Sequence, residues 1–144
     1  MKRKLALSFL LAICMIFSCA CNLVKSPDYY ELNGDDSVIS FTNVVGDRKV
    51  STKKIDMTNA IQSIAYSYKE IENAYVEAET YIDHLLEEDG FYYSGMLNMD
   101  ENEDEITVYK ASPNDKEYEI RVIVRYSNDT KTVKITVQRE KVIK

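Results

Sequence analysis

The chain has 144 residues, of which 29% are charged and 45% are hydrophobic, and its formal net charge is −6. This length fits a single small domain that buries its own core. An acidic chain lacks the basic footprint that nucleic-acid phosphates require, so the composition argues against a nucleic-acid-binding protein.

The first 20 residues are predicted to be a signal peptide that is cleaved. A basic start, Met1–Lys4, precedes an apolar run, Leu5–Phe17, and a small-residue exit, Ser18–Cys21. The apolar run is shorter than the roughly twenty residues that a membrane-spanning helix needs. Cleavage removes three basic residues, so the net charge of −6 becomes −9 in the mature chain.

Cysteines that directly follow small residues make this segment resemble the signal of bacterial lipoproteins. That family has an aliphatic residue at −3, a small residue at −1 and the lipid-modified cysteine at +1. Ile16 and Ser18 fit this pattern around Cys19, although Phe17 at −2 is bulky, and Cys21 fits only at −1. The resemblance implies a diacylglyceryl thioether on Cys19, with Cys21 as the alternative. Two or more acyl chains hold a protein stably on a membrane.

The expected location is therefore the extracytoplasmic face of the cell membrane, with a covalent lipid (palmitate or a similar acyl chain) as the anchor. An ordinary secretory signal that releases the protein and a retained membrane helix are the alternatives. The three cysteines are Cys14, Cys19 and Cys21. Since none follows position 21, no disulfide can bridge the domain, and its core alone must hold the fold.

Residues 21–36 are predicted to form a flexible tether, because turn-forming residues punctuate them and no hydrophobic period runs through them. A single domain is expected over 37–144. Its first strand is predicted over 38–45, where β-branched residues dominate. A short polar strand is predicted to return over 48–55, and its lysines suit the edge of a sheet.

Residues 57–89 allow two interpretations. Apolar residues recur at steps of four and three throughout, which predicts one unusually long helix. Residues 63–68 also alternate with period two and include good strand formers. We favour a strand over 61–70 and a helix over 74–88 with Asn73 as its N-cap. The predicted buried face of this helix comprises Ala74, Ala78, Tyr81, Ile82, Leu85 and Leu86.

The last third is predicted to be a meander of four strands, over 91–98, 105–111, 118–126 and 133–138, separated by polar turns. The fold class is then α+β, with one main amphipathic helix packed on an antiparallel sheet. The order of strand, helix and meander resembles cystatin-like domains over 38–139. No cystatin binding motif is present, so this resemblance implies no site. A Tyr-x-Tyr strand, Tyr66–Tyr68, and the helix end Leu85–Phe91 are similar to small lipoproteins of Gram-positive bacteria.

A search for catalytic chemistry yields no catalytic, cofactor-binding or metal-binding residue that we would assign. The only histidine, His84, has no recognisable nucleophile around it. The acidic run Asp100–Glu105 resembles a calcium loop only partly, since Glu105 stands where the loop needs glycine and Ala111 where it needs glutamate. The tyrosine doublets, Tyr29-Tyr30 and Tyr92-Tyr93, must each expose one ring if they lie on strands.

We therefore expect a protein that is not an enzyme: a binding module anchored to the membrane by its lipid, with an envelope or surface protein as its partner. One alternative is an exclusion, immunity or inhibitor protein that blocks an envelope partner. A hydrolase of cell-wall polymer is the least favoured alternative.

Overall fold

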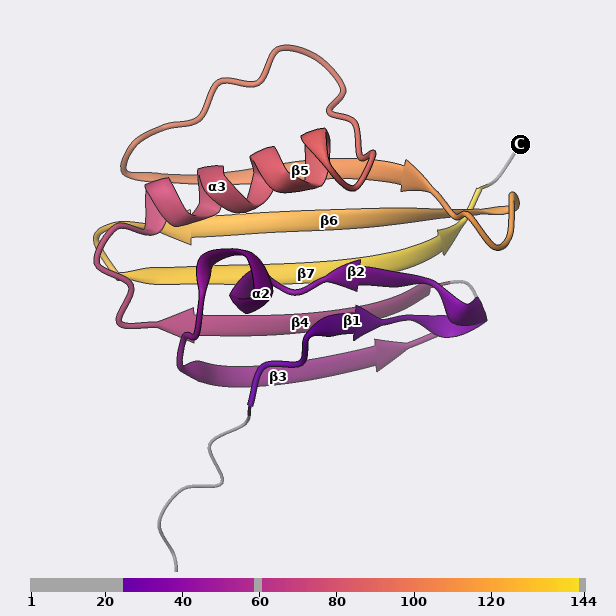
Figure 1. Ribbon diagram of the computed structural model, residues 1–144, viewed down its shortest axis with the longest axis horizontal. Helices are drawn as coiled ribbons and strands as arrows, with labels where there is room; N and C mark the ends of the chain where they lie inside the picture. Colours follow the sequence, from indigo (N-terminus) through magenta and orange to yellow (C-terminus); the bar gives the residue numbers. More distant parts are fainter. Residues whose placement is uncertain (1–24, 59–60, 143–144) are drawn as a thin grey trace, which may run out of the picture.

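The computed structural model describes residues 25–58 and 61–142, and these form two layers (Figure 1). The first layer is a five-stranded antiparallel sheet in the order β3-β4-β7-β6-β5. Its strands are β3 (Val50–Met57), β4 (Ile61–Lys69), β5 (Glu103–Ala111), β6 (Tyr118–Ser127) and β7 (Thr132–Lys141). The structure confirms an α+β fold with one main helix on an antiparallel sheet.

The second layer covers one face of that sheet. Helix α3 (Ala74–Glu87) contacts β6, β5 and β7. A small hairpin and a short helix cover the remaining half, toward β4 and β3 (Figure 1). The hairpin comprises β1 (Tyr29–Glu31), the 3-10 turn η1 (Asn33–Asp35) and β2 (Ser37–Ile39), and α2 (Phe41–Val45) follows it.

The structure decides between the two interpretations of residues 57–89 in favour of a strand and a helix. Strand β4 spans Ile61–Lys69 and buries every second side chain. Glu70 follows it, with a φ of +61° that is incompatible with either a strand or a right-handed helix. Asn73 then caps α3 by accepting a hydrogen bond from Val76 N. Of the predicted helix face, all but Leu86 are buried, and Leu86 is partly buried.

The predicted tether over 21–36 is wrong for the residues that form the hairpin. Tyr30 is buried, and it pairs with Val38 across the hairpin. The hairpin stays on the sheet because its tyrosine and its turn make buried contacts, which a composition argument cannot detect.

Two predicted strands are also corrected. Residues 38–45 contain the end of β2 and the helix α2, because the Ser40 hydroxyl accepts a hydrogen bond from Asn43 N and caps a helical turn. Residues 91–98 form no strand. Only Tyr92 bridges to Tyr109 at the edge of β5, and the following segment is irregular. Three strands rather than four therefore follow α3.

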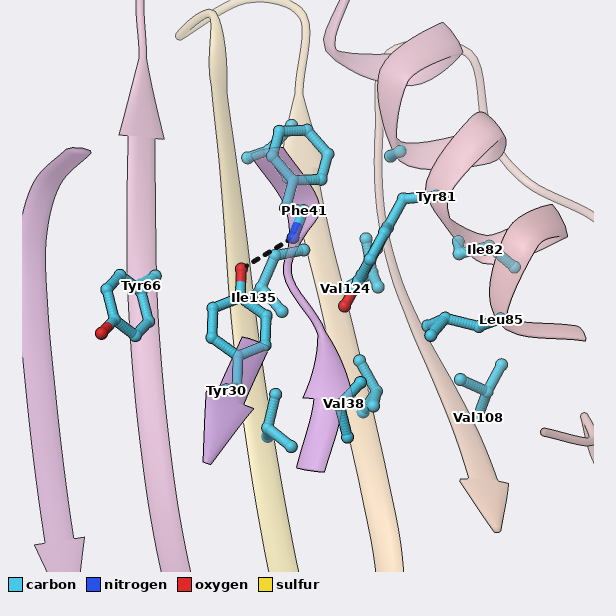
Figure 2. Close-up of a cluster of buried hydrophobic side chains, with 14 of the residues drawn as sticks. Tyr30, Val38, Phe41, Tyr66, Tyr81, Ile82, Leu85, Val108, Val124 and Ile135 are labelled. Carbon is cyan, nitrogen blue, oxygen red and sulfur yellow. Dashed lines mark hydrogen bonds between the residues drawn. The ribbon is translucent and has the colours of Figure 1, made fainter. Parts of the chain in front are cut away.

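The core between the layers is rich in tyrosine. Figure 2 shows Tyr30, Phe41 and Tyr81 meeting over the sheet, with Tyr81 and Phe41 edge to face at 5.5 Å between ring centroids. In residues 25–58 and 61–142 every fully buried hydroxyl has a hydrogen-bond partner, as burial of a polar group requires. Tyr81 donates to the carbonyl of Ile39 over 2.8 Å, and the Tyr30 hydroxyl accepts from Phe41 N over 3.0 Å. Among the described residues no helix is long and apolar enough to cross a membrane.

Candidate binding groove

A groove of about 640 Å³ runs between the hairpin and the β3 side of the sheet. Residues of β1 and the segment before it form one wall, β3 forms the other, and β4 forms the floor. Its lining residues are Pro27, Asp28, Tyr29, Tyr30, Glu31, Lys53, Ile55, Met57, Gln62, Ile64 and Tyr66. It is a concave surface that combines apolar and polar side chains, as binding sites do.

Two large apolar side chains of the β3 wall are exposed to solvent. Ile55 is 53% exposed and Met57 is 62% exposed. They lie opposite Ile64 and Gln62 of β4, whose side chains are buried under the hairpin. Ile55 and Met57 therefore point to the covered face of the sheet, but the hairpin does not extend far enough to cover them.

The main chain of β3 is unpaired along its outer side. Thr58 N donates to the carbonyl of Ile61, so this pair is hydrogen-bonded, and alternate pairs along the strand follow it. By this alternation, Lys53, Ile55 and Met57 direct their N–H and C=O groups away from β4. In the described part of the chain no strand lies on that side.

The β1 wall is fixed in place by a chain of buried hydroxyls. Tyr30 and Tyr68 share a hydrogen bond of 2.7 Å, and Tyr68 contacts the Ser26 hydroxyl at 3.0 Å. Burial, with the neighbouring Tyr81 and Tyr68 phenols adding to it, raises the pKa of Tyr30 well above its usual value. The phenol of Tyr30 therefore stays protonated, and its hydrogen bonds hold β1 on the sheet.

Strand β1 also has an unpaired side. Asp28 C=O accepts from Ser40 N, and Leu32 N donates to Asp36 C=O. Asp28, Tyr30 and Leu32 therefore direct their main-chain groups toward the other arm of the hairpin. Tyr29 and Glu31 lie between them and direct their main-chain groups away from β2. Two strand edges with unpaired groups thus flank the groove.

An aromatic ring of the groove floor lies beside a cation of the β3 wall. The Tyr66 ring packs on Tyr30 at 5.1 Å between centroids, and Lys53 Nζ lies 5.4 Å from the Tyr66 centroid. Asp28 and Glu31 add negative charge on the opposite wall. The groove therefore presents an apolar centre between a cationic wall and an anionic wall.

The far end of the hairpin is held to the sheet by a buried ionic network. The Asp36 carboxylate accepts hydrogen bonds from Ser112 Oγ (2.6 Å), Arg139 Nε (2.8 Å) and Asn114 Nδ2 (3.0 Å). The Arg139 guanidinium carbon lies 3.6 Å from the centroid of the Tyr118 ring. Burial alone raises the pKa of Asp36, but the hydrogen bonds from Ser112, Arg139 and Asn114 outweigh it and the pKa lies below its usual value.

The predicted lipidation site, Cys19 or Cys21, lies outside the described residues. His84 is partly exposed on α3, away from the groove.

In the acidic run, Asp100 Oδ1 accepts from Asn102 N, and Asp104 bonds to main-chain N–H groups of Asp100 and Glu105. These carboxylates serve to shape a turn. Of the tyrosine doublets, Tyr29 is exposed and Tyr30 buried, as expected for a strand.

None of the groove residues is predicted as a site from the sequence. The groove exists only because the hairpin folds over β4, and the composition of that segment predicts a tether. One local signal is available: Asn33-Gly34 between Tyr30-Glu31-Leu32 and Val38-Ile39 is a turn dipeptide between apolar stretches, which indicates a hairpin.

Comparisons with protein-family models, with curated proteins and with solved structures found no match for this chain. The groove must therefore be interpreted from its own chemistry.

Proposed function

We propose that the protein is a lipid-anchored module of the extracytoplasmic membrane face that is not an enzyme and that binds an extended segment of an envelope protein in the groove. The observation that supports this most directly is that exposed apolar side chains of the β3 wall face the unpaired edge of β1 across the groove. The signal-like segment before position 21 supports the anchor and the location.

An extended peptide suits the groove better than a compact ligand does. A strand that lies along β1 would pair with the free N–H and C=O groups of Tyr29 and Glu31. Every second side chain of such a segment would point into the groove, where Ile55 and Met57 of the β3 wall and Tyr66 of the floor offer apolar surface. Main-chain pairing would give affinity, and the groove's apolar side chains would select those of the ligand.

The charges on the two walls indicate which extended segment would fit the groove. Lys53 lies on one wall, while Asp28 and Glu31 lie on the other. A segment with an acidic residue toward β3 and a basic residue toward β1 would be complementary to both walls, which favours specificity and association rate.

The test is crosslinking in cells that express the full chain. A photoreactive amino acid replaces Tyr29 on the groove wall, which is 50% exposed, or Val76 on α3, which is 45% exposed, as the matched control. We expect one envelope protein to be captured at position 29 and not at position 76. Equal capture at both positions, or capture of nothing but this same chain, would contradict the proposal.

A further inference from the structure

The outer edge of strand β3 is unpaired in the described part of the chain, whatever the groove binds. Strand β3 is an edge strand of eight residues with unpaired main-chain groups at Lys53, Ile55 and Met57. Soluble proteins usually protect such edges with lysines that repel a second strand. Whether the lysines here give that protection decides what the edge does.

Two of the three lysines near this edge are already engaged within the chain. Lys49 Nζ lies 3.2 Å from the Glu70 carboxylate, and Lys53 Nζ lies over the Tyr66 ring in the groove. Lys54 remains, on the opposite, open face of the sheet, because it pairs with Ala65 in the ladder. Asp56 stands two residues further on the same face, so the open side of the edge carries one cation and one anion.

This spacing makes the edge complementary to itself in one antiparallel register. A register centred on Lys53 or Lys54 puts two lysines directly opposite each other, and one centred on Asp56 opposes two aspartates; like charges opposite each other are destabilising. A register centred on Met57 runs past the end of β3. A register centred on Ile55 opposes Ile55 to itself and brings Lys54 opposite Asp56 of the second copy, twice.

We propose that two copies of this chain pair β3 with β3 about a two-fold axis at Ile55 and join their sheets into one ten-stranded sheet. Lys53, Ile55 and Met57 direct their main-chain groups outward, so this register aligns donors with acceptors and forms about six inter-chain hydrogen bonds. The contact is isologous, as in most dimers. The bulge between Val50 and Thr52 limits the pairing to the segment from Lys53 onward.

The pairing also covers exposed apolar surface. Ile55 contacts its own copy at the axis, and Met57 lies opposite the aliphatic stem of Lys53 of the second copy. Because the axis is perpendicular to the sheet, the two grooves open on the same side and adjoin. This inference concerns the outer edge of β3 and does not depend on the ligand proposed for the groove.

Cysteine crosslinking of the full chain tests this register. In a hydrogen-bonded antiparallel pair the two Cα atoms lie about 5.5 Å apart, which is within the disulfide range of about 4.4–6.8 Å. Under mild oxidation Ile55→Cys is expected to give a covalent dimer. The controls are the unsubstituted chain, which reports the native cysteines, and Ile123→Cys on the open face of a central strand.

Two single-cysteine variants, expressed together, test how the two strands are aligned. Lys53→Cys co-expressed with Met57→Cys is expected to crosslink between the two variants, whereas each alone places its cysteines four residues out of register and does not. Dimer from Ile55→Cys no greater than that from Ile123→Cys, or equal crosslinking by the single and mixed variants, would overturn the proposal.

A charge exchange tests the same contact without relying on geometry. In the Ile55→Cys chain, Asp56→Lys places a second cation opposite Lys54 at both symmetric contacts and is expected to lower the dimer yield roughly fivefold. Adding Lys54→Asp reverses both charges and should restore the yield. Because these side chains are exposed, the double variant separates a lost contact from a lost fold. Failure of the double exchange to restore the dimer would exclude this register.

Discussion

Asp36 and Arg139 lie 103 positions apart in the chain and form a buried ion pair, with Arg139 Nε donating to Asp36 Oδ2 over 2.8 Å. The Asp36 side chain is fully buried, and that of Arg139 is 9% exposed. The pair joins the turn of the N-terminal hairpin to the last strand of the sheet. It therefore holds the wall of the candidate groove.

Removing one partner of this pair is expected to destabilise the protein strongly. Asp36→Ala leaves the Arg139 guanidinium buried without its carboxylate, and breaking a buried pair in this way costs about 3–5 kcal/mol. The measurement is the free energy of unfolding in urea. The control is Lys141→Ala, which removes an exposed ion pair with Glu117 and should cost no more than about 1 kcal/mol. Equal effects of the two substitutions would contradict the role assigned to Asp36.

The lowered pKa of the Asp36 carboxyl group predicts that the fold is less stable in acid. The pKa of Asp36 is lower in the folded state than in the unfolded chain, so the unfolded state binds the proton more readily. The stabilisation is complete above the unfolded pKa and is lost as pH falls toward the folded pKa. We expect the free energy of unfolding to fall below about pH 4 and the slope to be smaller in Asp36→Asn. An unchanged slope would show that other carboxylates dominate.

Gly34 is predicted to be required beside the pair. Its φ is +72°, and a Cβ atom there would lie 2.8 Å from Arg139 Nη2. Gly34→Ala should cost about 1–3 kcal/mol from backbone strain, plus the displacement of Arg139. Gly90 is a matched control, because its φ is +73° and a Cβ atom there would meet no other atom within 4 Å. Unfolding in urea should show a larger loss for Gly34→Ala than for Gly90→Ala; equal losses would mean that Arg139 moves freely.

The elements that are predicted correctly from the sequence are those with a long hydrophobic period. Strands β4, β6 and β7 each alternate over nine or ten residues. Helix α3 carries its own capping residue, Asn73. In these segments local preference and burial agree, so a period in the sequence corresponds to one buried face.

The hairpin could not be predicted in the same way. Strands β1 and β2 have three residues each, too few for a period to emerge. Their stability comes from contacts such as Asp36 with Ser112, 76 positions away. The groove depends on that hairpin, so none of its residues was identified. Ile55 was predicted on an edge strand, but its role beside the groove required the tertiary structure.

The anchor proposed at Cys19 gives a prediction that separates the two candidate cysteines. In cells supplied with radiolabelled palmitate, Cys19→Ser should abolish labelling of the full chain, because the thioether forms on that sulfur, while Cys21→Ser should keep it. Membrane association of the chain should follow the label, since the acyl chains supply the attachment. The opposite pattern would assign the lipid to Cys21. Labelling in neither the parent chain nor the variants would instead favour an ordinary secretory signal, and the groove would then act in a released protein.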